Sequence, residues 1–340
     1  MAVPACRGTC ARPVLLLLSC CFCPAASVLL LPVLLLMNSL LDPVAVPLQR
    51  GALTISIDLE LLWGVWDNPL SSRELHCGPT ERAIATRLLE LFERYQTAAT
   101  WAIVGRLLDD SRGYDGLRGD RDAWFAPDII DQIRRDGTEH EIGSHSWGHI
   151  YCHQSTAPAV REDLGRARDL HRQWGLPFDS FVFPRNQVAH LDELKHAGLR
   201  VFRSTDAGLL HWTESRVPSL RPAVNLMEKA LALPTATVLP LQHANGLIEL
   251  PSSTLLMGRG GSRRLISPAR FAAKMRRALL RAAESRTIFH LWFHPSNFYD
   301  EPDVQFGILE HCLRHAATLR TEGRLDVRTM GDFAPQTVPT

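Results

Sequence analysis

The stretch Leu53-Thr54-Ile55-Ser56-Ile57-Asp58-Leu59-Glu60 decides the fold class of this chain. Apolar residues dominate it up to Asp58, which is typical of a strand buried within a sheet. In an extended strand, residues two apart face the same side, so Asp58 and Glu60 would project together. Two carboxylates so close are stable together when a cation binds between them. The stretch therefore predicts a core strand that ends in a chemically active pair.

Strand-like and helix-like segments alternate along the rest of the chain. Further strands are expected at 98–104, 141–144, 180–183, 200–203, 247–250 and 287–293. Amphipathic or otherwise helical segments are expected at 80–95, 127–135, 161–174, 191–197, 268–285 and 306–322. This alternation predicts an α/β fold with a parallel sheet, open or closed into a barrel, and helices outside. Such folds place their chemistry at the carboxyl ends of the strands.

A pair of histidines follows the strand expected at 141–144. The run His145-Ser146-Trp147-Gly148-His149 places two imidazoles four residues apart, on one helical face or in a tight turn. One carboxylate and two imidazoles, with a position left open for water, form a common hydrolytic metal site. The second carboxylate of the Asp58/Glu60 pair would then serve as a base. The two motifs together predict a metal-dependent hydrolase.

Two further polar residues follow expected strands. Arg185 comes just after the strand at 180–183, and a guanidinium beside Asp58 would keep that carboxylate ionised and oriented. Along the strand at 287–293, alternation places His290 and His294 on one side, with His294 at the mouth. His294 is therefore the expected proton donor, and His290 an interior histidine.

Composition excludes one class of partner. The chain has 340 residues, enough for a large α/β domain. Its 37 Lys+Arg nearly balance its 36 Asp+Glu, whereas a nucleic-acid-binding protein usually carries a basic stripe. We therefore expect no nucleic-acid partner.

The first 50 residues differ in composition from the rest. No charged residue occurs from 13 to 41, and a run of this length can span a bilayer or act as a secretory signal. Membrane association through residues 13–41 is one alternative, with the protein anchored or exported. Met37 as the true start is another, and the protein would then be cytoplasmic. We expect an apolar segment at 1–50 and a catalytic domain at 51–335.

The motifs resemble those of the polysaccharide deacetylase family, which has NodB homology and forms carbohydrate esterase family 4. The resemblance covers about residues 51–335. The family's first motif pairs a base carboxylate with a metal-binding one, and Asp58-Leu59-Glu60 fills this place with Asp-x-Glu instead of adjacent aspartates. The second motif, H-[ST]-x-x-H, is matched in full by the run from His145 to His149. Pro184-Arg185 resembles the third motif with its order altered, and His294 would supply the last.

The resemblance implies a distorted (β/α) barrel of about seven parallel strands. It also implies a hydrolase that removes N-acetyl groups from amino sugars of a polysaccharide or its precursor. The implied ligands of a divalent ion, expected to be Zn²⁺, are Glu60, His145 and His149, and the implied catalytic residues are Asp58, Arg185 and His294. The Asp-x-Glu spacing leaves open whether Asp58 or Glu60 is the base.

Two alternatives share this fold. A metal-independent amidase could act on another C–N bond, but such proteins tend to lack the complete histidine pair. A non-catalytic carbohydrate-binding barrel would lack the base, whereas Asp58 and His294 are both present.

Overall fold

The computed structural model describes residues 42–109, 116–206 and 235–335. The apolar run at 13–41, with its expected membrane association, lies outside them. Within the described part, no helix combines the length and apolarity that crossing a bilayer requires. The compact unit that contains the sheet begins at Pro43, ahead of residue 51. The reason is that β1 (Val44–Ala45) pairs antiparallel with β7 (Leu241–Gln242) and so belongs to the sheet.

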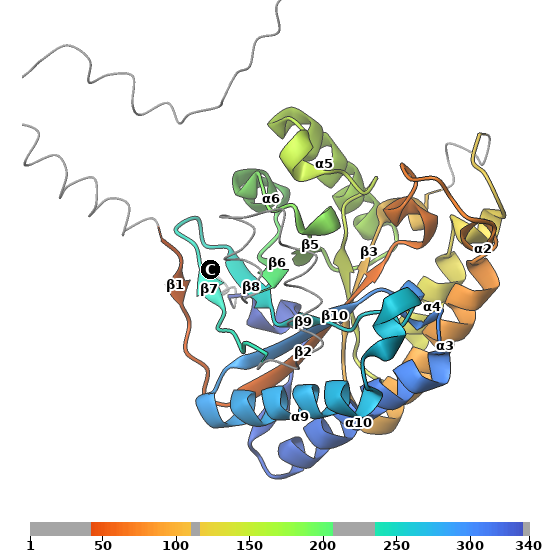
Figure 1. Ribbon diagram of the computed structural model, residues 1–340. Helices are drawn as coiled ribbons and strands as arrows, with labels where there is room; N and C mark the ends of the chain where they lie inside the picture. Colours follow the sequence, from red (N-terminus) through yellow and green to blue (C-terminus); the bar gives the residue numbers. More distant parts are fainter. Residues whose placement is uncertain (1–41, 110–115, 207–234, 336–340) are drawn as a thin grey trace, which may run out of the picture. The chain divides into compact units, whose positions relative to one another are not determined.

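A mostly parallel sheet, surrounded by helices, forms the centre of this unit (Figure 1). The parallel strands are β2 (Gly51–Leu59), β3 (Thr100–Ile103), β4 (Glu141–Ser144), β5 (Ser180–Val182), β6 (Val201–Asp206), β8 (Ile248–Ser252), β9 (Thr254–Leu255), β10 (Ile288–Phe293) and β11 (Leu325–Val327). Their order in space is β8, β6, β5, β4, β3, β2, β10 and β9, and β11 pairs with β2 at one end.

The two edges of this sheet meet through one short stretch of chain. Only Ser253 separates β8, which pairs with β6, from β9, which pairs with β10. The backbone N–H of Ser253 donates to the carbonyl oxygen of His290 at 2.8 Å, which extends the pairing between them. When β8 and β9 are taken as one interrupted strand, seven parallel strands follow one another around a ring. The expected α/β barrel-type fold is thus confirmed.

Helices lie between the strands in sequence, and the longer ones pack on the outer face of the sheet (Figure 1). They are α2 (Ser72–Leu75), α3 (Gly78–Tyr95), α4 (Pro127–Arg135), α5 (Ala157–Gln173), α6 (Leu191–Ala197), α9 (Pro268–Ser285) and α10 (Pro302–Thr321). The bounds of α4, α6 and α9 agree with those expected from the sequence. In α3, the apolar face that includes Ile84, Leu88 and Phe92 is buried. Periodicity and proline position were sufficient to place the longer helices, whereas α2 was not expected.

The alternation of side chains along β2 separates the core from the site. Ile55 and Ile57 face outward and join the main apolar cluster beneath α3, α9 and α10. Full burial of each such side chain stabilises the fold by about 1.5–3 kcal/mol. Ser56 and Asp58 face the other way, into the interior of the ring. The outer layer therefore stabilises the barrel, while the inner layer carries polar groups.

A buried histidine outside the site makes stability depend on pH. His171, in α5, is 1% exposed, and its Nδ1–H donates to the carbonyl oxygen of Pro177 at 2.6 Å. Burial lowers its pKa from 6.5 to about 4. The unfolded chain therefore binds this proton first as pH falls. The contribution of the neutral, buried His171 to the free energy of unfolding is full above pH 6.5 and is lost as the pH falls from 6.5 to 4.

We predict that His171→Asn will flatten the pH dependence of stability over this range. The amide N–H of asparagine can still donate to Pro177, but it takes up no proton. The free energy of unfolding, measured with urea at several pH values, should fall less steeply in the variant by up to about 1.4 kcal/mol per pH unit. Equal slopes in the two proteins would contradict the prediction.

Candidate active site

The first strand ends in a sharp turn that directs Glu60 toward the mouth of the barrel. Asp58 is the last inward-facing residue of β2 and is 3% exposed. Leu61 then adopts a left-handed conformation with φ of 44°. The side chain of Glu60 folds over Gly64, where a Cβ atom would lie 2.0 Å from Oε1 of Glu60. Only glycine at position 64 leaves this carboxylate in place.

The two histidines of the second motif lie in a turn after β4 rather than on a helix. His149 adopts a left-handed conformation with φ of 57°. Asp163, on α5, holds this turn by accepting hydrogen bonds from the backbone N–H groups of Trp147 and Gly148, each at 2.8 Å. A buried carboxylate with two backbone donors is a strong anchor. Asp163 was not predicted from the sequence, because nothing in a helical repeat marks one acidic residue as facing inward.

Glu60, His145 and His149 come together from sequence-distant segments. Oε2 of Glu60 lies 3.2 Å from Nε2 of His145 and 3.0 Å from Nε2 of His149. One ligand atom from each residue lies within 4.8 Å of the other two. Nδ1 of His145 is 2.8 Å from the carbonyl oxygen of Val182, so the proton resides there and Nε2 presents its lone pair. This donor set fits a divalent ion such as Zn²⁺.

The charge states of these groups also suit a cation. Burial raises the pKa of Glu60, but the adjacent imidazoles of His294, His145 and His149 lower it well below its usual range. Burial lowers the pKa of His149, so its imidazole is neutral at pH 7. An ionised carboxylate and neutral imidazoles are the forms that bind metal ions.

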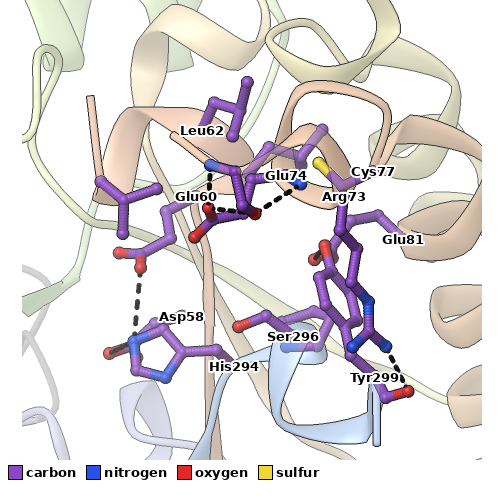
Figure 2. Close-up of a pocket in the computed structure, with 14 residues that line it drawn as sticks. Asp58, Glu60, Leu62, Arg73, Glu74, Cys77, Glu81, His294, Ser296 and Tyr299 are labelled. Carbon is purple, nitrogen blue, oxygen red and sulfur yellow. Dashed lines mark hydrogen bonds and ion pairs between the residues drawn. The ribbon is translucent and has the colours of Figure 1, made fainter. Parts of the chain in front are cut away.

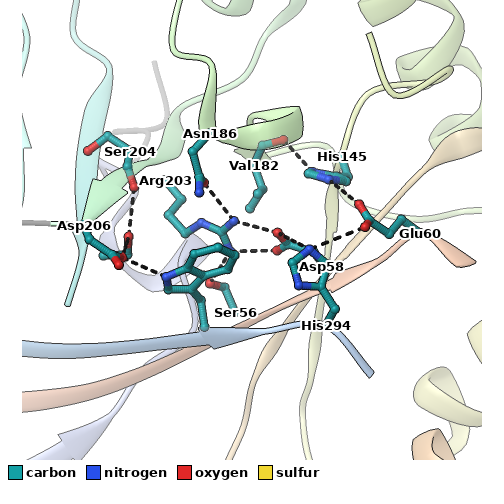
Figure 3. Close-up of polar contacts among 12 residues, drawn as sticks. Ser56, Asp58, Glu60, His145, Val182, Asn186, Arg203, Ser204, Asp206 and His294 are labelled. Atoms are coloured by element: carbon teal, nitrogen blue, oxygen red, sulfur yellow. Dashed lines mark hydrogen bonds and ion pairs between the residues drawn. The ribbon is translucent and has the colours of Figure 1, made fainter. Parts of the chain in front are cut away.

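The other carboxylate, Asp58, is held by Arg203 (Figure 3). Two parallel bonds of 2.7 Å join the guanidinium nitrogens Nη1 and Nη2 of Arg203 to Oδ1 and Oδ2 of Asp58. Nη1 also donates to Ser56 at 3.0 Å, and Nη2 donates to Asn186 at 3.1 Å. Burial raises the pKa of Asp58, but the positive charge of Arg203 outweighs it with help from nearby histidines, and the net shift is downward. Asp58 is therefore an oriented, ionised carboxylate.

The prediction that Arg185 holds Asp58 is wrong. Arg185 follows β5 as expected, but its backbone is left-handed, with φ of 53°, and its side chain pairs with Asp67 at 3.0 Å near the surface. Arg203 lies inside β6, and its side chain is fully buried in the barrel. A charged residue within an otherwise buried parallel strand is unusual, and this signal could have identified Arg203 from the sequence.

His294 stands at the mouth of the barrel, as predicted from the alternation in β10. Its Nε2 lies 3.7 Å from Oδ2 of Asp58 and 3.4 Å from Oε1 of Glu60. Its backbone N–H donates to Oδ1 of Asn297 at 2.9 Å, which fixes the chain where it leaves the strand. His290, one layer deeper, is fully buried and bonded to Ser56 at 2.9 Å, in agreement with its expected interior position.

A pocket of about 320 Å³ opens beside these groups (Figure 2). Asp58, Glu60 and His294 form one side of it. The remaining lining residues come from the segment that follows β2 and from the segment that follows β10: Leu61, Leu62, Val65, Ser71, Arg73, Glu74, Cys77, Glu81, Pro295, Ser296 and Tyr299. The arrangement can bind a cation, supply a base and deliver a proton within one solvent-accessible cleft.

Residues 77–201 match the family model described as polysaccharide deacetylase, a segment that contains the complete His145–His149 motif. Through this segment the chain is similar to the polysaccharide deacetylase family. It is a hydrolase of the type that acts on non-peptide carbon–nitrogen bonds. No curated protein sequence matches it.

Solved structures with the same fold include two whose descriptions name a polysaccharide deacetylase. A protein of Mycobacterium smegmatis described as a polysaccharide deacetylase is 16% identical, with a TM-score of 0.58, and the match covers 88% of this chain and 98% of that one. A protein of Pseudomonas aeruginosa PAO1 with the same description is 15% identical, with a TM-score of 0.52 and coverage of 83% and 88%. Puue allantoinase is 13% identical, with a TM-score of 0.55 and the same coverage. These likenesses concern the fold.

The position of Arg203 in this deacetylase domain leads to a prediction about stability. Arg203→Met leaves Asp58 as a buried carboxylate without its partner, which typically lowers the free energy of unfolding by about 3–5 kcal/mol. Arg185→Met removes a half-exposed ion pair and should change it by no more than about 1 kcal/mol. Chemical denaturation of both variants measures the difference.

A double variant provides the control. Arg203→Met combined with Asp58→Asn contains no unpaired buried charge, so it should be more stable than Arg203→Met alone. If the single and double variants were equally stable, the ion pair would not be the cause of the loss.

Proposed function

We propose that this protein is a metal-dependent N-deacetylase that acts on N-acetylated amino sugars of a polysaccharide or its precursor. One observation carries the proposal. Glu60, His145 and His149 converge with ligand atoms within 4.8 Å of one another, beside the ionised Asp58. A divalent ion held there, with Zn²⁺ suited to this donor set, supplies Lewis-acid polarisation of the acetyl carbonyl and of water.

The protein's own groups provide the proton transfers. Asp58 accepts a proton from the attacking water, and Arg203 keeps its carboxylate ionised and oriented. The water oxygen bonds to the acetyl carbon, and the bond from that carbon to the sugar nitrogen breaks. His294, which is accessible at the mouth, donates a proton to the departing nitrogen, so acetate and a free amine are the products. Because Arg203 holds Asp58 while both histidines surround Glu60, the geometry supports Asp58 as the base.

The alternatives explain fewer of these contacts. A metal-independent amidase has no need of a carboxylate between two imidazoles, although the allantoinase shares the fold. A non-catalytic sugar-binding barrel has no need of an ionised buried Asp58 next to a histidine at the mouth. The deacetylase proposal accounts for all of these groups at once.

We predict that His145→Ala will remove both the metal and the activity. One of the three protein ligands is lost, so metal content should fall from about one ion per chain to a small fraction, and acetate release should fall with it. The measurements are elemental analysis of the purified protein and acetate release from a panel of N-acetylhexosamine substrates. His153→Ala is the matched control, because His153 is exposed and lies in the same loop region. Normal acetate release by metal-depleted His145→Ala would overturn the proposed function.

We predict that His294→Gln will lower the activity without removing the metal. Glutamine keeps a polar side chain at the mouth but cannot deliver the proton, so kcat should fall about 10²–10⁴-fold. Metal content should remain that of the natural protein, because His294 is not among the three ligands. A parallel loss of metal and activity would instead place His294 in the metal site.

A further inference from the structure

The pocket beside the proposed metal ligands extends to a second, unassigned carboxyl group. Figure 2 shows Glu60 and His294 on one side of this pocket and Glu81 and Tyr299 on the other. Glu81 lies in the first turn of α3, and Tyr299 follows β10. A substrate that reaches the site through this pocket must therefore pass next to Glu81.

The two carboxyl oxygens of Glu81 differ in their hydrogen bonding. The residue is 3% exposed, and its Oε1 accepts a hydrogen bond from the hydroxyl group of Tyr299 at 2.5 Å. Its Oε2 is buried and has no hydrogen-bond partner within the described part of the chain. An acidic residue suits the first turn of a helix, but an exposed one would serve that purpose equally well. A buried carboxyl oxygen that lacks a hydrogen-bond partner and belongs to a residue lining a pocket is best explained by a ligand that forms a hydrogen bond with it.

The charges around the pocket restrict what that ligand can be. Glu74 and Glu81 add to the carboxyl groups of Asp58 and Glu60. Among the described residues, Arg73 is the one arginine that lines the pocket, and it already donates to Asp300 at 3.0 Å. Within this described lining, an acidic sugar would meet carboxylates and no uncommitted guanidinium, whereas a neutral, hydroxyl-rich sugar would meet acceptors for its hydroxyl groups.

We propose that Glu81 binds a hydroxyl group of a neutral N-acetylated sugar through Oε2 and thereby helps to select neutral over acidic substrates. This inference rests on the proposed function, because it takes the acetamido group of the same sugar to lie at Glu60 and the two histidines. Burial is the main cause that raises the pKa of Glu81 from 4.5 to about 7. The hydrogen bond from Tyr299 and the positive charge of Arg82 lower this pKa, and the negative charge of Glu60 raises it. Near neutral pH the group can therefore accept a hydrogen bond or donate one.

The test compares three variants with neutral N-acetylhexosamine oligosaccharides, their analogues that lack one ring hydroxyl, and an oligosaccharide that contains a uronic acid. Glu81→Met removes the acceptor at similar volume, and Glu81→Gln keeps an acceptor. Glu141→Gln is the matched control, because burial also raises the pKa of Glu141, but its carboxyl group is bonded to Thr100 and Gly331 away from the pocket. Acetate release gives kcat and KM, and thermal unfolding reports folding.

The expected result is a KM about tenfold higher for Glu81→Met on neutral sugars, with kcat and metal content little changed. Glu81→Gln and Glu141→Gln should retain the natural KM within about threefold. One deoxy analogue should show the same tenfold rise with the natural protein and no further rise with Glu81→Met. Discrimination against the uronic acid should weaken in Glu81→Met.

The outcomes separate this inference from the proposed function. Acetate release from neutral sugars with the same KM in the natural protein and in Glu81→Met overturns the inference alone. If Glu81→Met does not fold, the natural protein is tested with the deoxy analogues instead. If the loss of no single hydroxyl group raises its KM, the inference is overturned. Failure of the natural, metal-loaded protein to release acetate from any N-acetylated sugar overturns the proposed function and the inference with it.

Discussion

The ion pair between Arg203 and Asp58 is the contact on which the rest of the site depends. Both side chains lie inside the ring of strands, where an unpaired charge would be destabilising by several kcal/mol. The guanidinium comes from β6 and the carboxylate from β2, so the pair spans the barrel interior and connects strands that are not neighbours. It keeps Asp58 ionised at neutral pH and fixes the direction in which the carboxylate can accept a proton.

The barrel separates stability from chemistry by the alternation of its strands. Outward residues such as Ile55 and Ile57 pack beneath the helices and bury apolar area. Inward residues form a polar column, with Ser56 and His290 in a deep layer and the ion pair above them. The groups proposed to bind the metal lie above that layer, where the chain leaves the strands. Hydrogen bonds of Ser56 with His290 and with Arg203 connect the deep layer to the ion pair.

Periodicity predicted the strands β2, β3, β4, β5, β6, β8 and β10 and most helices, because burial of one face imposes a repeat that the sequence must carry. It also placed His294 at the mouth and His290 below it. It failed for Arg185, since the left-handed backbone at that residue turns the side chain outward, and a single sequence does not display φ. The short strands β1, β7, β9 and β11 were missed as well, because two or three residues carry no repeat, yet β9 joins the edges of the sheet.

The sequence by itself determined the α/β class, the outward and inward faces of the strands, and the motif residues Asp58, Glu60, His145 and His149. These features are local, since spacing and residue type specify them without knowledge of distant neighbours. Only the tertiary structure decided that Arg203 orients Asp58, that Asp163 holds the histidine turn and that Glu81 faces the same pocket. Each of these is a contact between segments far apart in the chain, and parallel strands can bring many different residues to one barrel mouth. Which of them meet depends on register and backbone conformation, which the fold sets as a whole.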